Sequence, residues 1–289
     1  HLRKSKPVVL AAGLIWGMIA IAYSNTPHYE MVEHEIRHSF LEYTELAFFL
    51  LVAMTYINAL EERNVFNSLK SWLIKNQFSY RQLFWITGVL AFFLSPLADN
   101  LTTALVLCAV VVAVGSSSPK FVGLACVNIV VAANAGGAFS PFGDITTLMV
   151  WQAGQLDFLQ FFALVIPSVV NYIIPASIMH FFVSDHKPDV AETSVTIKYG
   201  GKTIILLGLL TIVTAVSFHN FLHLPPVFGM MTGLAYLQLY SFYIKISVKD
   251  IEEQKYDFFE NVARVEWDTL LFFFGVILSV GGLGFIGYL

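Results

Sequence analysis

The residues best suited to chemistry lie in one short stretch, SPLADNLTT at residues 95–103, between two long apolar runs. Its carboxylate, Asp99, is the only charged residue between Arg81 and Lys120, and its amide is Asn100. Its hydroxyls belong to Ser95, Thr102 and Thr103. A lone carboxylate among apolar residues is costly to bury, so we interpret Asp99 as a functional group. The alternative is that Asp99 only caps the next helix, although Ser or Asn would do so without a charge.

A second polar stretch, NAGGAFSPFGDITT, interrupts the long apolar segment 121–153. Its three glycines and its proline predict a broken helix, and the freed backbone carbonyls and amides need partners. Its candidate ligands are Asn134, Asp144, Thr146 and Thr147. Hard cations prefer such oxygen ligands, whereas an anion carrier would not place a fixed negative charge at each break. The two breaks therefore favour a small cation.

A desolvated carboxylate gains proton affinity, and a bound cation opposes protonation. A proton and a metal ion then compete for the same oxygens. If the protein reorients only when one of them is bound, it exchanges one for the other with no chemical step and no cofactor. Glu45, near the outer end of its apolar run, either lies on this ion path or sits at headgroup level.

An alternative from a different class rests on residues 34–38, which read H-E-x-x-H. On a helix, His34 and His38 share one face, and Glu35 could act as the general base of a zinc hydrolase. Such a site needs a third ligand, and no later residue stands out as one. The same segment also fits an interfacial amphipathic helix with solvated charges.

Composition restricts the class of protein. Hydrophobic residues make up 57% of the chain, charged residues only 12%, and the mean hydropathy is +0.70. These values predict an all-α polytopic membrane protein rather than a soluble domain. The two cysteines lie in apolar runs and indicate neither a disulfide framework nor a metal site. We expect a lipid bilayer and small cations as partners and no nucleic acid, and a homodimer is compatible with these partners.

The predicted organisation has four parts. Residues 1–39 hold a transmembrane helix and an outer amphipathic segment, and residues 40–183 form a first repeat. Residues 184–264 link the halves, and residues 265–289 start a second repeat. The first repeat comprises a span, a re-entrant hairpin at 82–114, a broken helix at 121–153 and a span at 158–183.

The distribution of basic residues predicts the orientation. If the N-terminus lies inside, every Lys and Arg except Arg37 falls on the inner side. Arg81 and Lys120 bracket residues 82–114, so the hairpin would enter and leave from the inside. Its polar tip would then reach toward the midplane, buried in protein or facing water.

An inverted repeat is indicated when EYTELAFFLLVAM from Glu42 is laid over EWDTLLFFFGVIL from Glu266. The two segments would cross in opposite directions, as in secondary transporters whose sites lie at discontinuous helices. By this register the counterpart of Asp99 would lie beyond Leu289. We therefore expect the chain to be a fragment that would not transport by itself.

The sequence resembles the NhaD-type sodium/proton antiporters of the ion transporter superfamily. The resemblance rests on LEYTELAFFLLVAMTYINALEERNVF from Leu41, FFLSPLADNLTTALVL from Phe92 and NAGGAFSPFGDITTLMVWQAG from Asn134. It implies exchange of Na⁺ or Li⁺ for H⁺ by an inverted-repeat fold, in a bacterial cytoplasmic membrane or a plastid envelope. It carries a transport role onto Ser95, Asp99, Asn100, Asn134, Asp144, Thr146, Thr147 and Glu45. An anion or arsenite carrier of the same superfamily is the alternative.

Overall fold

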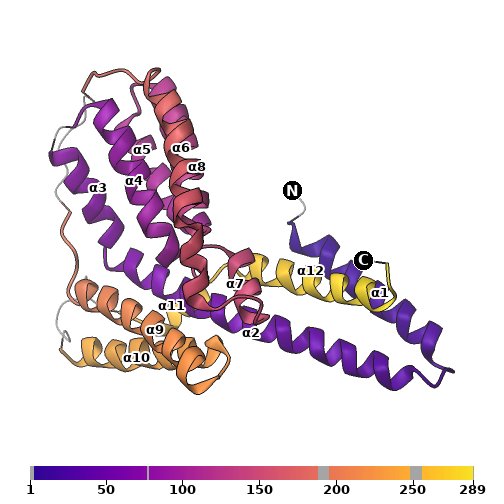
Figure 1. The fold of residues 1–289 in the computed structure, drawn as a ribbon. Helices are drawn as coiled ribbons and strands as arrows, with labels where there is room; N and C mark the ends of the chain where they lie inside the picture. Colours follow the sequence, from indigo (N-terminus) through magenta and orange to yellow (C-terminus); the bar gives the residue numbers. More distant parts are fainter. Residues whose placement is uncertain (1–2, 77, 188–194, 248–255, 289) are drawn as a thin grey trace. The chain divides into compact units, whose positions relative to one another are not determined.

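The computed structural model describes residues 3–76, 78–187, 195–247 and 256–288. Every regular element within these ranges is a helix (Figure 1), which confirms the predicted all-α class. The helices are α1 (Ser5–Tyr23), α2 (Tyr29–Glu62), α3 (Val65–Lys75), α4 (Tyr80–Ala98), α5 (Asn100–Val114), α6 (Pro119–Gly137), α7 (Ile145–Gln152), η1 (Phe158–Leu164), α8 (Val165–His180), α9 (Gly201–Leu222), α10 (Pro226–Ser247), α11 (Phe258–Ala263) and α12 (Trp267–Phe285). Lys249 and Lys255, which entered the charge distribution, lie outside the described residues.

Eight helical segments in the described ranges are long and apolar enough to cross a membrane, with η1 and α8 together forming one of them. Helix α5 is apolar but shorter. The helices also end and restart at both predicted breaks, after Ala98 and after Gly137. Whether the α4–α5 hairpin enters and leaves on one side of the bilayer remains a prediction.

Helix α2 differs from the sequence-based expectation. The boundary at residue 40, between an outer amphipathic segment and a span, falls inside one continuous helix of 34 residues. The charged residues of its first turns lie at helical spacing and are mostly exposed, as in the ion pair between Arg37 and Glu33. Solvated charges on one face do not interrupt a helix, so composition changes here while secondary structure does not.

The chain divides into two compact units. The first comprises His1–Asn58, Gly208–Lys245 and Tyr256–Leu289. Within it α1 packs along α12, where the Trp16 indole donates a hydrogen bond of 2.8 Å to the carbonyl of Leu278. The buried hydroxyl of Tyr56 connects α9 and α10, because it accepts from Thr211 Oγ1 at 2.9 Å and donates to the Gly233 carbonyl at 2.7 Å.

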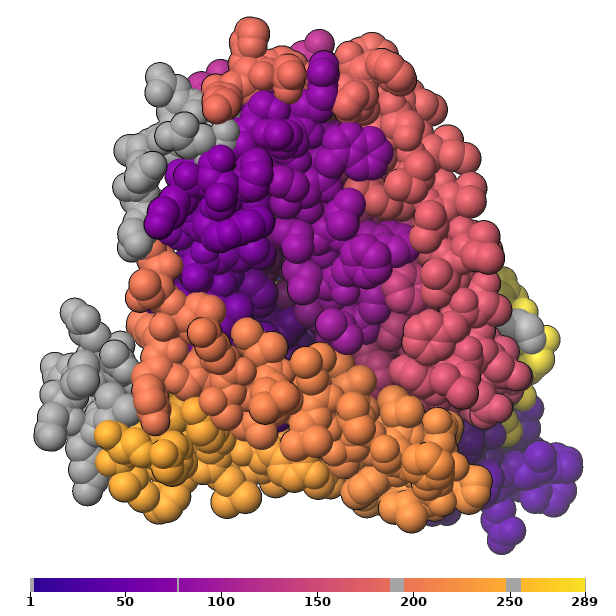
Figure 2. All heavy atoms as spheres, turned by 60° about the vertical axis from the view of Figure 1, so that its left-hand side comes forward, coloured from indigo at the N-terminus to yellow at the C-terminus, as the bar shows by residue number. Residues whose placement is uncertain are grey.

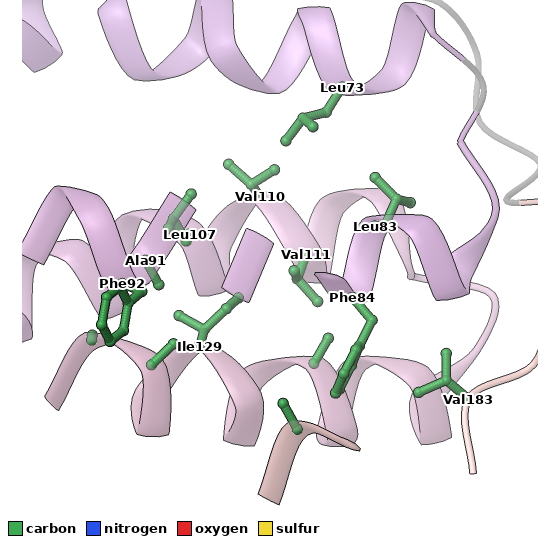
Figure 3. Close-up of a cluster of buried hydrophobic side chains, with 14 of the residues drawn as sticks. Leu73, Leu83, Phe84, Ala91, Phe92, Leu107, Val110, Val111, Ile129 and Val183 are labelled. Carbon is green, nitrogen blue, oxygen red and sulfur yellow. The ribbon is translucent and has the colours of Figure 1, made fainter. Parts of the chain in front are cut away.

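The second unit comprises Ala59–Leu207 and Ile246–Lys255, and it holds both helix breaks. Helix α4 begins at a capping box, in which Ser79 and Gln82 satisfy each other's backbone amides. It then packs against α5 and α6 through a buried apolar cluster that includes Phe84, Leu107 and Ile129 (Figure 3). The small residues that α6 buries let its backbone approach α4 closely, and they are Ala125, Ala132, Ala133, Ala135, Gly136 and Gly137.

The outer faces of α9 and α10, orange in Figure 2, expose large apolar side chains. These include Leu209, Leu210, Val213, Leu239 and Phe242. Soluble proteins rarely expose so much contiguous apolar surface, whereas a lipid-facing surface requires it. The surface therefore agrees with the composition in indicating a membrane protein.

Candidate ion-binding site

The first helix break consists of a single residue, Asp99, which ends α4 and starts α5. Its backbone has φ 55° and ψ 159°, a conformation that costs a residue with a side chain about 1–3 kcal/mol. The carboxylate holds the turn, since it accepts from the Thr102 N–H at 2.8 Å and from the Thr102 hydroxyl at 2.7 Å. Asp99 therefore does cap α5, as the simpler sequence interpretation required.

Two hydroxyl groups join the end of α4 to α6 and to the second break. Ser95 is fully buried on α4, and its hydroxyl donates to the carbonyl of Ala133 on α6 at 2.6 Å. In the other direction, the Ser140 hydroxyl from the second break donates to the carbonyl of Pro96 at 2.9 Å. These two bonds fix the end of α4 beside the end of α6.

Glycine allows this close approach. Pro96 has no N–H, so it cannot donate a helical hydrogen bond to the carbonyl of Phe92 four residues earlier. Gly136 lies against that carbonyl, and a Cβ added at Gly136 would fall on its oxygen. Further along, Gly137 and Gly143 cross so closely that a Cβ on Gly143 would lie 2.5 Å from the Gly137 Cα.

The second break ends at Asp144, which caps α7 as Asp99 caps α5. One oxygen of Asp144 accepts from the Thr146 N–H at 2.8 Å and from the Thr146 hydroxyl at 2.7 Å. The Thr147 hydroxyl donates to the carbonyls of Ser140 and Asp144, both at 2.8 Å. Two acidic caps therefore lie at the positive ends of two helix dipoles.

Asn100 joins the two breaks. Its side-chain amide donates to Asn134 Oδ1 at 3.1 Å and, through a short hydrogen bond, to the other oxygen of Asp144. The Asn134 amide donates to the Val130 carbonyl at 2.8 Å, which orients the Asn134 oxygen toward Asn100. Asp99 and Asp144 are half-buried and Asn134 is exposed, so the cluster opens on the surface of its unit.

Among the described contacts, two predicted residues make no side-chain hydrogen bond to this cluster. Thr103 is buried, and its hydroxyl has no hydrogen-bond partner among the described residues, although its N–H donates to the Asp99 carbonyl at 3.2 Å. Glu45 lies on α2 in the first compact unit, half-buried. Its place on an ion path stays a prediction.

The H-E-x-x-H segment forms part of α2, and His34 and His38 are exposed. His38 Nδ1 lies 3.7 Å from Glu42 Oε1, in the manner of a surface contact. Among the described residues, no three His, Cys, Asp or Glu side chains gather as a metal site would require.

Sequence reasoning missed two polar residues of the second unit. Ser140 lies inside the predicted break, yet its hydroxyl was not recognised as a link between the breaks. Asn128 is fully buried on α6, where its amide donates to the Phe84 carbonyl at 2.8 Å. An amide within an otherwise apolar run was the available signal.

The chain matches the CitMHS family, described as citrate transporter, over residues 4–289. It is 53% identical to the Na(+)/H(+) antiporter NhaD of Vibrio cholerae and 52% identical to that of Vibrio parahaemolyticus, in each case over 100% of the chain. The chain belongs to the CitMHS family and, within it, to the NhaD group. A plant relative, sodium/proton antiporter 1 of Arabidopsis thaliana, is 31% identical over 99% of the chain and 49% of that protein.

Membership of the NhaD group confirms the resemblance that the motifs around Asp99 and Asp144 predicted, and these relatives are named as antiporters rather than enzymes. The family and the eight apolar segments together confirm an integral, multi-pass membrane protein. The chain spans 65% of the length of the Vibrio cholerae relative and 75% of the Vibrio parahaemolyticus one.

Proposed function

We propose that the protein exchanges Na⁺, or Li⁺, for H⁺ across a membrane, and that Asp99 and Asp144 carry the exchange. The observation that carries this proposal is the amide of Asn100, which spans from Asn134 to Asp144 where two helix breaks meet. The names of the NhaD relatives, Na(+)/H(+) antiporters, support the choice of ions.

The hydrogen bonds suggest how ion and proton compete. The Asn100 amide donates to one oxygen of Asp144, while Thr146 holds the other. A sodium ion requires oxygen ligands. It would bind the Asp144 oxygen that now accepts from the Asn100 amide, together with the side-chain oxygen of Asn134. A proton on Asp144 would also remove an acceptor from that amide. Ion and proton would use the same carboxylate oxygen of Asp144, which makes their binding mutually exclusive, and each would weaken the hydrogen bond from Asn100.

The description of the matched family as citrate transporter raises anion transport as the competing function. Helix N-termini attract anions, and α5 and α7 both begin at the site. Each N-terminus, however, is already occupied by a carboxylate of this chain, Asp99 or Asp144. An organic anion would meet two fixed negative charges, whereas a cation would be attracted by them.

The same proposal includes the orientation of the chain and the membrane in which it lies. The distribution of Lys and Arg supports an N-terminus on the inner side of a bacterial cytoplasmic membrane. The protein's partners are then the lipid bilayer and the transported cations, and a homodimer is compatible with them.

Proton flux in membrane vesicles tests the proposal, using the protein at its full natural length. Adding Na⁺ or Li⁺ should release stored protons, while K⁺ and citrate should not. Citrate-driven flux without a response to Na⁺ would establish the anion carrier instead. A response to K⁺ as large as that to Na⁺ would contradict a selective oxygen site.

A further inference from the structure

A surface pocket with a volume of about 690 Å³ lies at the end of α4 opposite Asp99, beside the end of α8. Its charged side chains are Arg81, Asp185 and Lys187, and its aromatic wall includes Trp85 and His180. None of these residues belongs to the ion site. A pocket of this size with convergent polar groups is large enough for a small ligand or a lipid headgroup.

In the described part of the chain, the guanidinium of Arg81 is only partly engaged in hydrogen bonds. Arg81 Nη2 donates to the Val183 carbonyl at 3.2 Å, and Arg81 lies 3.9 Å from Asp185. Arg81 Nε is buried and has no hydrogen-bond partner in the described part of the chain. Asp185 already accepts the Ser79 hydroxyl at 2.8 Å. With Lys187, the pocket carries two bases against one acid, so it favours an anionic group.

The aromatic wall supplies another donor. The Trp85 indole N–H donates to His180 Nδ1 at 2.9 Å. An indole nitrogen can only donate, so Nδ1 of His180 must be the acceptor and the neutral ring carries its proton on Nε2. That N–H, the Arg81 guanidinium and the Lys187 ammonium are all groups that bind phosphate oxygens.

An apolar stripe leads away from the pocket along α4. Ile86 lines the pocket, and Val89 and Phe93 follow it at positions three and seven residues later, on the same face of the helix. Val89 is 41% exposed and Phe93 is 64% exposed. An acyl chain could lie on this stripe while its headgroup remained at the basic end.

We propose that this pocket binds the phosphate of an anionic phospholipid, held by Arg81 and Lys187, with an acyl chain along Ile86, Val89 and Phe93. The basic residues lie on the side that the charge distribution predicts to be inner. A free phosphate ion would use the same bases but not the apolar stripe, which favours the lipid. The assignment does not depend on Na⁺/H⁺ exchange.

The test is quenching of tryptophan fluorescence by brominated lipid in the purified full chain. Brominated phosphatidylglycerol should quench at a lower concentration than brominated phosphatidylcholine, and Trp85→Phe should remove the anion-selective part of the quenching. Neutralising both bases, in the double variant Arg81→Gln and Lys187→Gln, should raise the half-quenching concentration about 25-fold. Lys120→Gln, which removes an exposed base outside the pocket, is the matched control and should change nothing.

Asp185→Asn provides a gain-of-binding variant, because it removes the one acid and keeps an acceptor for Ser79. It should tighten phosphatidylglycerol binding about fivefold, a result that misfolding cannot produce. Equal quenching by the two lipids, or an unchanged half-quenching concentration in the double variant, would overturn the proposal. Complete displacement of the lipid by inorganic phosphate would assign the pocket to a soluble anion instead.

Discussion

The side-chain amide of Asn100, directly after the first helix break, donates a hydrogen bond to the carboxylate of Asp144, the last residue of the second. Asn100 begins α5 and Asp144 caps α7, and the whole of α6 lies between them in the chain. The hydrogen bonds of this one amide therefore depend on the positions of both breaks. Any ligand that takes the Asp144 oxygen also releases the contact between α5 and α7.

Replacing Asn100 by alanine should lower Na⁺-dependent proton flux at least about tenfold, because both the link to Asp144 and that to Asn134 are lost. Flux in vesicles measures the effect. Asn67→Ala is the control, since the amide of Asn67 is exposed and bonds only to Asn64 among the described contacts. Full activity of Asn100→Ala would show that the link has no part in transport.

Asp99→Asn tests whether Asp99 only caps α5 or also binds the transported ion. Asparagine also caps helices and also tolerates a positive φ, so thermal stability should fall by less than about 1 kcal/mol. Na⁺-dependent proton flux should nevertheless disappear, because the charge is gone. A variant that melts as the parent does and still exchanges ions would show that Asp99 only caps α5.

Gly136→Ala should destabilise the protein by about 1–3 kcal/mol, because the new methyl group meets the carbonyl of Phe92. Gly123→Ala is the matched control on the same helix, where an added Cβ meets nothing within 4 Å. That substitution should stabilise by about 0.5–1 kcal/mol through helix propensity. Thermal unfolding in detergent compares the two, and equal melting temperatures would contradict the close approach.

Tyr56→Phe tests the packing of the first unit. It removes a buried hydroxyl that bonds both to Thr211 and to Gly233, so unfolding should become easier by about 1–3 kcal/mol. Tyr243→Phe, at an exposed position on α10, should leave the unfolding free energy within about 0.5 kcal/mol of the parent. If the two variants unfold alike, the Tyr56 hydroxyl does not hold α9 to α10.

Much of the candidate ion site could be predicted from the sequence, because its signals are local. An acid between apolar runs identified Asp99, and a cluster of glycines with a proline identified the break before Asp144. Local sequence signals could not predict that the two breaks lie beside each other. It depends on the contact of Gly136 with Phe92 and on the hydroxyls of Ser95 and Ser140, which connect positions far apart in the chain.

The positive φ of Asp99 was also not predictable, since aspartate in a polar stretch is compatible with several turns. The continuity of α2 was missed for the opposite reason. A change in composition near residue 40 suggested a boundary, but hydrogen bonding along a helix does not depend on whether its side chains are charged or apolar.

The most direct test of the central claim compares Asp144→Asn with Asp157→Asn in the full-length protein. Asp157 is an exposed acid before η1 in the same unit, so the two substitutions remove the same charge in different settings. Sodium-dependent proton flux in vesicles should vanish in Asp144→Asn and remain at the parental level in Asp157→Asn. Undiminished flux in Asp144→Asn would contradict exchange by competition at this carboxylate.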